Sequence, residues 1–216
     1  MIVASDLEGT ITAGATWKGI GRYFQTHGRA TAYRFFFWSR FSLAPLVKLG
    51  LLDEQAFRNR WIADLPQLLR NWALADIQDL AEWVVEHELW PKRRVAIVSE
   101  LEQHQREGRR VVLASATYQP VLDVFARRIN AVALGTPLEI IAGQATGRLG
   151  GEINAGARKA AQLGAFLQNN TLHTAYGDTL PDVPMLKLST NPVVVHPDAQ
   201  LLNIAQAKGW RIVRPL

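Results

Sequence analysis

Four short segments of the chain are apolar almost without interruption and end in small polar residues. They are residues 2–6 (IVASD), 111–116 (VVLASA), 172–177 (LHTAYG) and 193–196 (VVVH). Short runs of this kind are typical of strands that are buried on both faces, as in a parallel sheet. Segments with helical periodicity precede two of them, at residues 96–107 and 158–169. We therefore predict an α/β fold with a doubly wound, mostly parallel, Rossmann-like sheet.

Two parts of the chain depart from this alternation. Residues 15–90 have a helical pattern throughout and contain six of the seven tryptophans. A helical block between the first and second strands suggests a cap over the carboxyl edge of the sheet. Residues 131–151 carry glycines at turn positions and predict a strand followed by a small β-flap. The expected division is a core of residues 1–14 and 91–216 and a helical cap of residues 15–90.

The composition excludes several kinds of protein. The chain has 216 residues, of which 48 % are hydrophobic, and no cysteine. These numbers favour one globular domain with an insertion, and they exclude a disulfide scaffold, a zinc-thiolate site and cysteine catalysis. We find no signal-peptide pattern and no run of about 18 apolar residues that would span a membrane. The expected location is the cytoplasm.

The positive charge is unevenly distributed. The net charge is +5, but no Asp or Glu occurs between Gly9 and Leu52, where six Lys and Arg residues lie. This distribution suggests a local anion-facing surface, and we expect no nucleic-acid partner. Residues 35–52 combine aromatic, apolar and basic residues, so an interfacial amphipathic helix and peripheral membrane contact stay open. The pattern does not indicate an oligomeric state.

Candidate catalytic residues follow the predicted strands. Residues 2–6 deliver Asp6 and Glu8, residues 111–116 deliver Ser115 and Thr117, and residues 172–177 deliver Asp178 and Asp182. Lys159 opens the helix before the third of these strands. In an open α/β sheet such side chains meet at the carboxyl ends of the strands. Each motif alone is common as a turn, a strand end or a helix cap. Together, carboxylates with a hydroxyl and an ammonium suit Mg²⁺ and a phosphoryl group.

The same residues carry a resemblance to a known family. SDLEGT, VVLASAT, Lys159 in GARKAAQL and YGDTLPDVPML resemble the four motifs of the haloacid dehalogenase superfamily. The long insertion after the first motif is similar to the helical cap of its phosphoserine-phosphatase-like branch, subfamily IB. The resemblance covers about two thirds of the chain.

The resemblance implies a Mg²⁺-dependent phosphomonoester hydrolase. Asp6 would attack phosphorus and form an aspartyl-phosphate, and Glu8 would act as general acid and base. Mg²⁺ would be held by Asp6, the Glu8 backbone carbonyl and Asp178, and Asp182 would hold a metal-bound water. The phosphoryl oxygens would be bound by Ser115, Lys159 and Thr10.

Glu8 departs from the family pattern, which usually has an aspartate at this position. One extra methylene moves the carboxyl by about 1 Å, a displacement large enough to change a rate. Two alternatives therefore stay open. One is a phosphotransferase that passes the phosphoryl group to an alcohol, and the other is a catalytically silent phosphate- or membrane-binding module.

The cap residues bear on the substrate, a small-molecule phosphomonoester. In the family an acidic residue early in the cap pairs with the ammonium of phosphoserine, near where Ala15 lies here. We therefore expect phosphoserine to be a poor substrate. Arg22, Arg34 and Arg60 are the candidate substrate residues. The cap aromatics either form the core of the cap itself or favour a lipid-like or aromatic phosphate.

Overall fold

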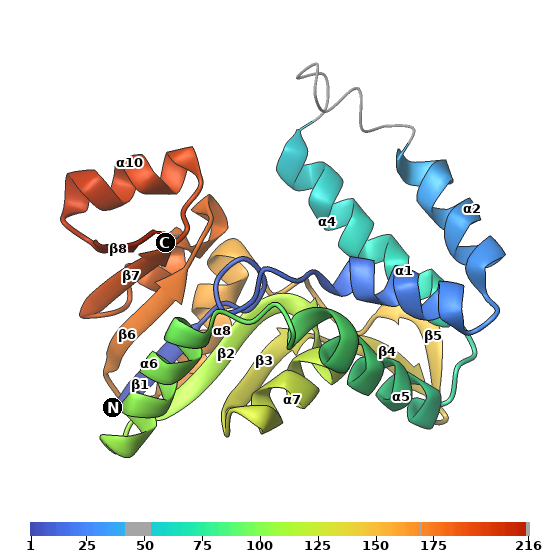
Figure 1. The fold of residues 1–216 in the computed structure, drawn as a ribbon, viewed down its shortest axis with the longest axis horizontal. Coiled ribbons are helices and arrows are strands. Elements are labelled where there is room, and N and C mark those ends of the chain that lie inside the picture. Colours follow the sequence, from blue (N-terminus) through green and yellow to red (C-terminus); the bar gives the residue numbers. More distant parts are fainter. Residues whose placement is uncertain (42–52, 169, 215–216) are drawn as a thin grey trace.

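The computed structural model describes residues 1–41, 53–168 and 170–214, and within them a six-stranded parallel sheet forms the centre of the molecule (Figure 1). The strand order is β3-β2-β1-β6-β7-β8, and each neighbouring pair is parallel. The strands are β1 (Ile2–Ser5), β2 (Arg110–Tyr118), β3 (Val132–Thr136), β6 (Leu172–Gly177), β7 (Asn191–Val195) and β8 (Arg211–Val213). This arrangement confirms the predicted fold class.

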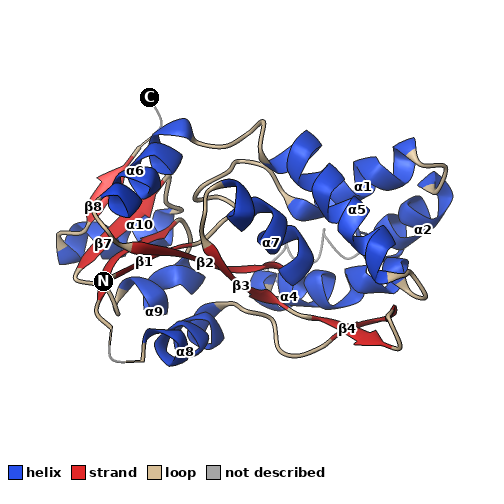
Figure 2. Ribbon diagram, turned by 90° about the horizontal axis from the view of Figure 1, so that it is seen from below, coloured by secondary structure: helices blue, strands red, loops and turns tan. Residues whose placement is uncertain are grey.

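Helices cover both faces of the sheet, which explains why the strands are apolar on both sides (Figure 2). Helices α6 (Val95–Arg106) and α7 (Gln119–Arg128) cover one face, and α8 (Gly156–Leu167), α9 (Val183–Leu186) and α10 (Ala199–Lys208) cover the other. The side chains of successive residues of β1 point alternately to the two sides of the sheet. Val3 belongs to the core on the α6 side, whereas Ile2 and Ala4 belong to the core on the α8 side.

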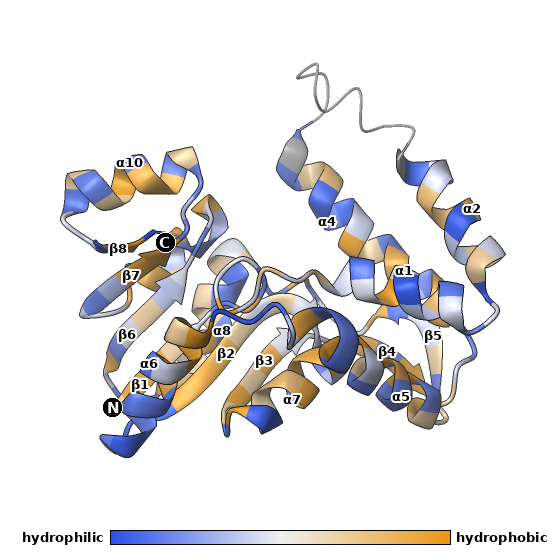
Figure 3. Ribbon diagram, in the orientation of Figure 1, coloured by the Kyte–Doolittle hydropathy of each residue, from blue (hydrophilic) through white to orange (hydrophobic). Residues whose placement is uncertain are grey.

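The elements between β1 and α6 form a further helical layer, called the helical insertion below, which shares a hydrophobic core with α6 and α7. They are α1 (Thr16–Thr26), α2 (Ala30–Phe41), α4 (Glu54–Asp64), the 3₁₀ segment η1 (Leu65–Leu69), α5 (Leu74–Val84) and the π-helical segment η2 (Val85–Leu89). Hydrophilic and hydrophobic residues are mixed around α2 and α4, unlike the mostly hydrophobic strands (Figure 3). Aromatic contacts hold the layer together, for example between Phe24 and Trp72, whose ring centres lie 5.4 Å apart.

A β-hairpin anchors the helical insertion to the rest of the chain. Strands β4 (Leu138–Ile141) and β5 (Gln144–Leu149) pair antiparallel, as the flap prediction requires. The backbone N–H of Asn71 donates to the carbonyl of Ala145 at 2.8 Å, and the N–H of Leu74 donates to the carbonyl of Gly143 at 3.1 Å. The hairpin therefore continues into the insertion through main-chain hydrogen bonds.

The structure differs from the sequence prediction in detail. Strand β8 lies outside the prediction, because its two apolar residues, Ile212 and Val213, stand between Arg211 and Arg214 and show no periodicity. Strand β7 ends at Val195 and not at residue 196, since His196 adopts a φ of +48° that leaves the extended region. The proposed interfacial helix falls largely on residues 42–52, which lie outside the described residues. In the described part of the chain, no helix has the length and apolar character needed to cross a bilayer.

Candidate functional site

The first strand delivers Asp6 to the carboxyl edge of the sheet and then turns sharply. The backbone N–H of Asp6 donates to the carbonyl of Tyr176 on β6 at 3.0 Å. The turn passes through Gly9, whose φ is +90°, and a Cβ at Gly9 would lie 1.9 Å from an oxygen of Asp178. Only glycine permits both this backbone conformation and this approach. The turn therefore places the first strand directly against the end of β6.

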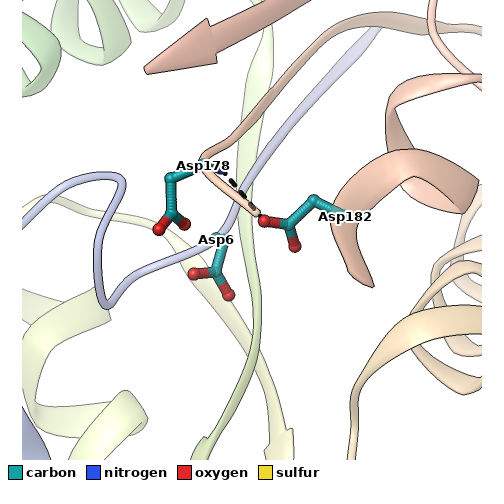
Figure 4. Close-up of side chains that lie close together, drawn as sticks. All are labelled: Asp6, Asp178 and Asp182. Atoms are coloured by element: carbon teal, nitrogen blue, oxygen red, sulfur yellow. Dashed lines mark hydrogen bonds between the residues drawn. The ribbon is translucent and has the colours of Figure 1, made fainter. Parts of the chain in front are cut away.

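Three aspartates face one another at this edge (Figure 4). Asp6, Asp178 and Asp182 each offer a carboxylate oxygen, and these oxygens all lie within 4.8 Å of one another. Lys159, in the first turn of α8, is 3 % exposed. Its Nζ donates to Asp6 Oδ1 at 2.7 Å and to Asp182 Oδ1 at 2.6 Å. The cluster thus brings together residues that are up to 176 positions apart in sequence (6 and 182).

Short contacts fix the orientation of the two later aspartates. The backbone N–H groups of Asp178 and Thr179 donate to Asp182 Oδ2 at 3.0 and 3.2 Å. The Thr10 hydroxyl donates to Asp178 Oδ1 at 2.9 Å. The structure therefore places Thr10 on a carboxylate of the cluster, and its expected phosphate-binding role stays a prediction.

Burial and the repulsion between the carboxylates shift the pKa values of the cluster. Burial raises the pKa of Asp6 to about 6 despite the opposing charge of Lys159. Burial, followed by the charges of Asp6 and Asp182, raises the pKa of Asp178 to about 8. Burial works to lower the pKa of Lys159, but the two carboxylates that it contacts outweigh burial and raise it. Three clustered carboxylates, of which only two contact the ammonium, favour a further cation, and an all-oxygen donor set fits Mg²⁺.

The Glu8 side chain is held by the end of β2. The Thr117 hydroxyl donates to Glu8 Oε1 at 3.0 Å and lies 3.2 Å from the hydroxyl of Ser115. Burial raises the pKa of the Glu8 carboxyl, and hydrogen bonds that include the one from Thr117 oppose the shift. Sequence reasoning placed Thr117 at this strand end without a role. The available signal was its position two residues after Ser115, which puts both side chains on one face of the strand.

One pocket of about 510 Å³ joins these groups to the helical insertion. Asp6, Glu8, Ser115, Lys159, Asp178 and Asp182 all line it. The structure thus brings together the residues that the sequence singled out for catalysis and metal binding, while their roles stay predictions.

The three arginines that we named as substrate candidates do not line this pocket. Arg22 pairs with Glu88 at 3.0 Å, and the Arg60 Nε lies 3.8 Å from Asp64. Arg34 lines a different surface hollow, together with other residues of α2. Arg58 lines the pocket instead. Sequence reasoning could not separate Arg58 from Arg60, because the phase of α4 relative to the core is set by packing.

Comparisons with known proteins agree with this geometry. Residues 3–187 match the family model of the haloacid dehalogenase-like hydrolases. The chain is 30 % identical to phosphoserine phosphatase SerB1 of Mycobacterium tuberculosis over 220 residues, which cover 96 % of this chain and 68 % of that protein. It is also 30 % identical to a histidinol-phosphatase of Neisseria meningitidis over 178 residues, which cover 76 % of each chain.

A solved structure supports the fold. A protein of unknown function from Bordetella pertussis Tohama I superposes with a TM-score of 0.82 at 22 % identity, covering 98 % of this chain and 97 % of that one. The sheet, the inserted helices and these matches define a phosphatase. The chain belongs to the haloacid dehalogenase-like hydrolase family.

Proposed function

We propose that this phosphatase hydrolyses small-molecule phosphomonoesters, depends on Mg²⁺ and works through an aspartyl-phosphate on Asp6. The observation that carries the proposal is the hydrogen bond between Lys159 Nζ and Asp6 Oδ1 at 2.7 Å, inside a pocket that Glu8 also lines. This hydrogen bond holds the Asp6 carboxylate in the pocket, from where it would attack phosphorus. Residues 15–90 act in this scheme as a cap over the site, and residues 1–14 and 91–216 act as the catalytic core.

The residues divide the reaction into two displacements. In the first, a carboxylate oxygen of Asp6 bonds to phosphorus, the ester P–O bond breaks, and the leaving oxygen takes the proton of Glu8. In the second, Glu8 takes a proton from water while that water bonds to phosphorus, and the P–O bond to Asp6 breaks. Burial raises the pKa of Glu8, which favours the protonated acid that the first step needs.

The same pocket holds the charge of the phosphoryl group. Ser115 and Lys159 bind its oxygens, while Thr117 keeps the Glu8 carboxyl in position through their 3.0 Å hydrogen bond. Asp6, Asp178 and the Glu8 carbonyl would hold Mg²⁺, with Asp182 beside it. When bound, Mg²⁺ offsets the negative charge that otherwise repels the attacking carboxylate from the phosphate.

The names of the relatives suggest phosphoserine and histidinol phosphate as candidate substrates, and the pocket argues against both. Each carries an ammonium group that needs an anion near the helical insertion. Among the described residues that line the pocket, the acids all belong to the carboxyl edge of the sheet: Asp6, Glu8, Asp178 and Asp182. We therefore keep the expectation that phosphoserine is a poor substrate.

The test is phosphate release from a panel of phosphomonoesters with Mg²⁺, with EDTA and with an added acceptor alcohol. We expect activity that disappears with EDTA and falls about 10³-fold or more in Asp6→Asn. Asp79→Asn, at an exposed position on α5, is the matched control and keeps full activity. Loss of the starting ester only when the alcohol is present, with formation of a new phosphoester in place of free phosphate, would indicate a phosphotransferase. Activity that survives in Asp6→Asn would refute the proposal.

A further inference from the structure

The pocket changes in character between the sheet and the helical insertion. The part formed by the strand ends carries the charged groups described above. The part formed by the insertion is mainly apolar and aromatic. Its apolar lining side chains are Trp17, Phe37, Phe57, Trp61, Ile62 and Leu65.

Trp61 is the centre of this aromatic wall. Its ring centre lies 5.9 Å from that of Trp17, 5.7 Å from that of Phe37 and 6.4 Å from that of Phe57. These residues come from three helices, α1, α2 and α4, so the wall is built by tertiary packing. Tyr118, at the end of β2, joins the wall to the core, since its hydroxyl donates to the carbonyl of Ile62 at 2.7 Å. The wall is therefore held in place by contacts within the chain itself.

Four polar side chains of the described insertion also line the pocket: Thr16, Gln55, Arg58 and Asn59. Gln55 and Asn59 bond to each other, with Gln55 Nε2 at 2.9 Å from Asn59 Oδ1. Arg58 is the charged side chain that the described part of the insertion contributes to the pocket. An amino-acid ester would place its ammonium next to the Arg58 cation, where the described part of the insertion contributes no carboxylate to pair with it, and this costs free energy. Transfer of an uncharged apolar group from water to this wall would instead lower the free energy.

We infer that the substrate is a phosphomonoester whose leaving group is a large apolar body, an alkyl chain or an aromatic ring system, without an ammonium group. The inference rests on the proposed function, because attack by Asp6 and protonation by Glu8 turn the leaving group toward the helical insertion. The aromatic wall buries that group while the strand ends hold the phosphate.

Binding to the Asp6→Asn protein with Mg²⁺ tests this assignment without turnover. The ligands are ethyl, butyl and hexyl phosphate in one series, phenyl and 2-naphthyl phosphate in a second, and phosphoserine as the amino-acid ester. Each buried methylene should lower Kd by about fourfold. Calorimetry should therefore show hexyl phosphate binding about 250-fold more tightly than ethyl phosphate, and phosphoserine binding no more tightly than ethyl phosphate.

A matched pair of variants locates the effect. Phe57→Ser removes one ring of the wall and should reduce the hexyl-to-ethyl ratio about fivefold or more, with little change for ethyl phosphate. Phe35→Ser makes the same substitution on α2, where Phe35 is 77 % exposed and outside the pocket, and should leave the ratio unchanged.

The outcomes separate this inference from the proposed function. A Kd that stays constant along both series, or phosphoserine binding more tightly than hexyl phosphate, overturns the inference even if the enzyme hydrolyses phosphoesters. A ratio that Phe57→Ser leaves unchanged overturns it as well. A Kd that falls steeply along a series, together with an unmodified protein that releases no phosphate from any ester, supports the inference and refutes the proposed hydrolase activity. The steeper of the two series identifies a chain or a ring as the leaving group.

Discussion

The two sides of the pocket are built in opposite ways. The floor, formed by the strand ends, uses a few charged side chains in fixed hydrogen-bonded positions, such as Lys159 between Asp6 and Asp182. The roof, formed by the helical insertion, uses overlapping aromatic rings around Trp61. Charge interactions depend on distance and on neighbours, whereas apolar burial depends mainly on area. A substitution in the floor should therefore lower the rate of the reaction, and one in the roof should change which substrate is preferred.

The largest expected effect comes from removing the cation of the floor. Lys159→Met leaves Asp6 and Asp182 buried without their shared ammonium. We expect a loss of about 10³-fold in kcat/KM and a destabilisation of about 3–5 kcal/mol in the free energy of unfolding. Added Mg²⁺ should recover part of the stability, because it supplies positive charge. Denaturation with and without Mg²⁺ measures this, and Lys208→Met at an exposed position on α10 is the control.

The floor should also make metal binding depend on pH. The Asp178 carboxyl, with a pKa raised to about 8, keeps its proton at neutral pH, and a bound cation displaces that proton. The apparent affinity for Mg²⁺ should therefore rise by up to about tenfold per unit between pH 6 and 8 and level off above. Calorimetry at four pH values checks this. Asp178→Asn should bind more weakly and without the slope, and an equal slope in that variant would contradict the explanation.

The link between the hydroxyls and Glu8 should have a smaller effect. Thr117→Val removes the donor to Glu8 while it keeps the shape of the side chain. We expect kcat to fall about tenfold with little change in KM, because Glu8 loses its orientation. The pKa of Glu8 should rise, since that hydrogen bond opposes the effect of burial, and the limb of the pH–rate profile that reports Glu8 should move to higher pH. Thr31→Val on α2 is the control, and an unmoved profile would argue against a positioning role.

The smallest effect on activity should come from the attachment of the roof. Glu88 is buried and accepts hydrogen bonds from Lys92 and from Arg22 of α1. Burial works to raise the pKa of Glu88, but these donors outweigh it and lower the pKa. The resulting stability is present above the unfolded-state pKa and is lost as the pH falls through the lowered value.

Glu88→Gln should thus destabilise the protein by about 1–3 kcal/mol near pH 7, by less in acid, and change kcat/KM by less than about twofold. Glu82→Gln is the comparison, since Glu82 pairs with Arg127 at the surface and should contribute little. Equal losses in the two variants, measured by denaturation at pH 7 and pH 4, would contradict this account.

The sequence by itself determined most of the floor. Short apolar strands covered on both faces predict a parallel sheet, and parallel strands deliver their following residues to one edge. The sequence alone therefore predicts that Asp6, Ser115 and Asp178 lie together and that Lys159 lies near them. These positions depend on local pattern and on a general rule of α/β topology.

Only the tertiary structure decided the roof and the finer contacts. Arg58 lines the pocket, whereas Arg22, Arg34 and Arg60 do not. This difference depends on how α1, α2 and α4 pack. The sequence does not predict that packing, because polar and apolar residues are mixed around these helices. The contact from Thr117 to Glu8 and the bridge from Lys159 to Asp182 join residues more than 20 positions apart. Strand β8 exists because β7 offers it an open edge. Sequence periodicity indicates which face of a helix or strand is buried. Which other element packs against that face depends on the whole tertiary structure.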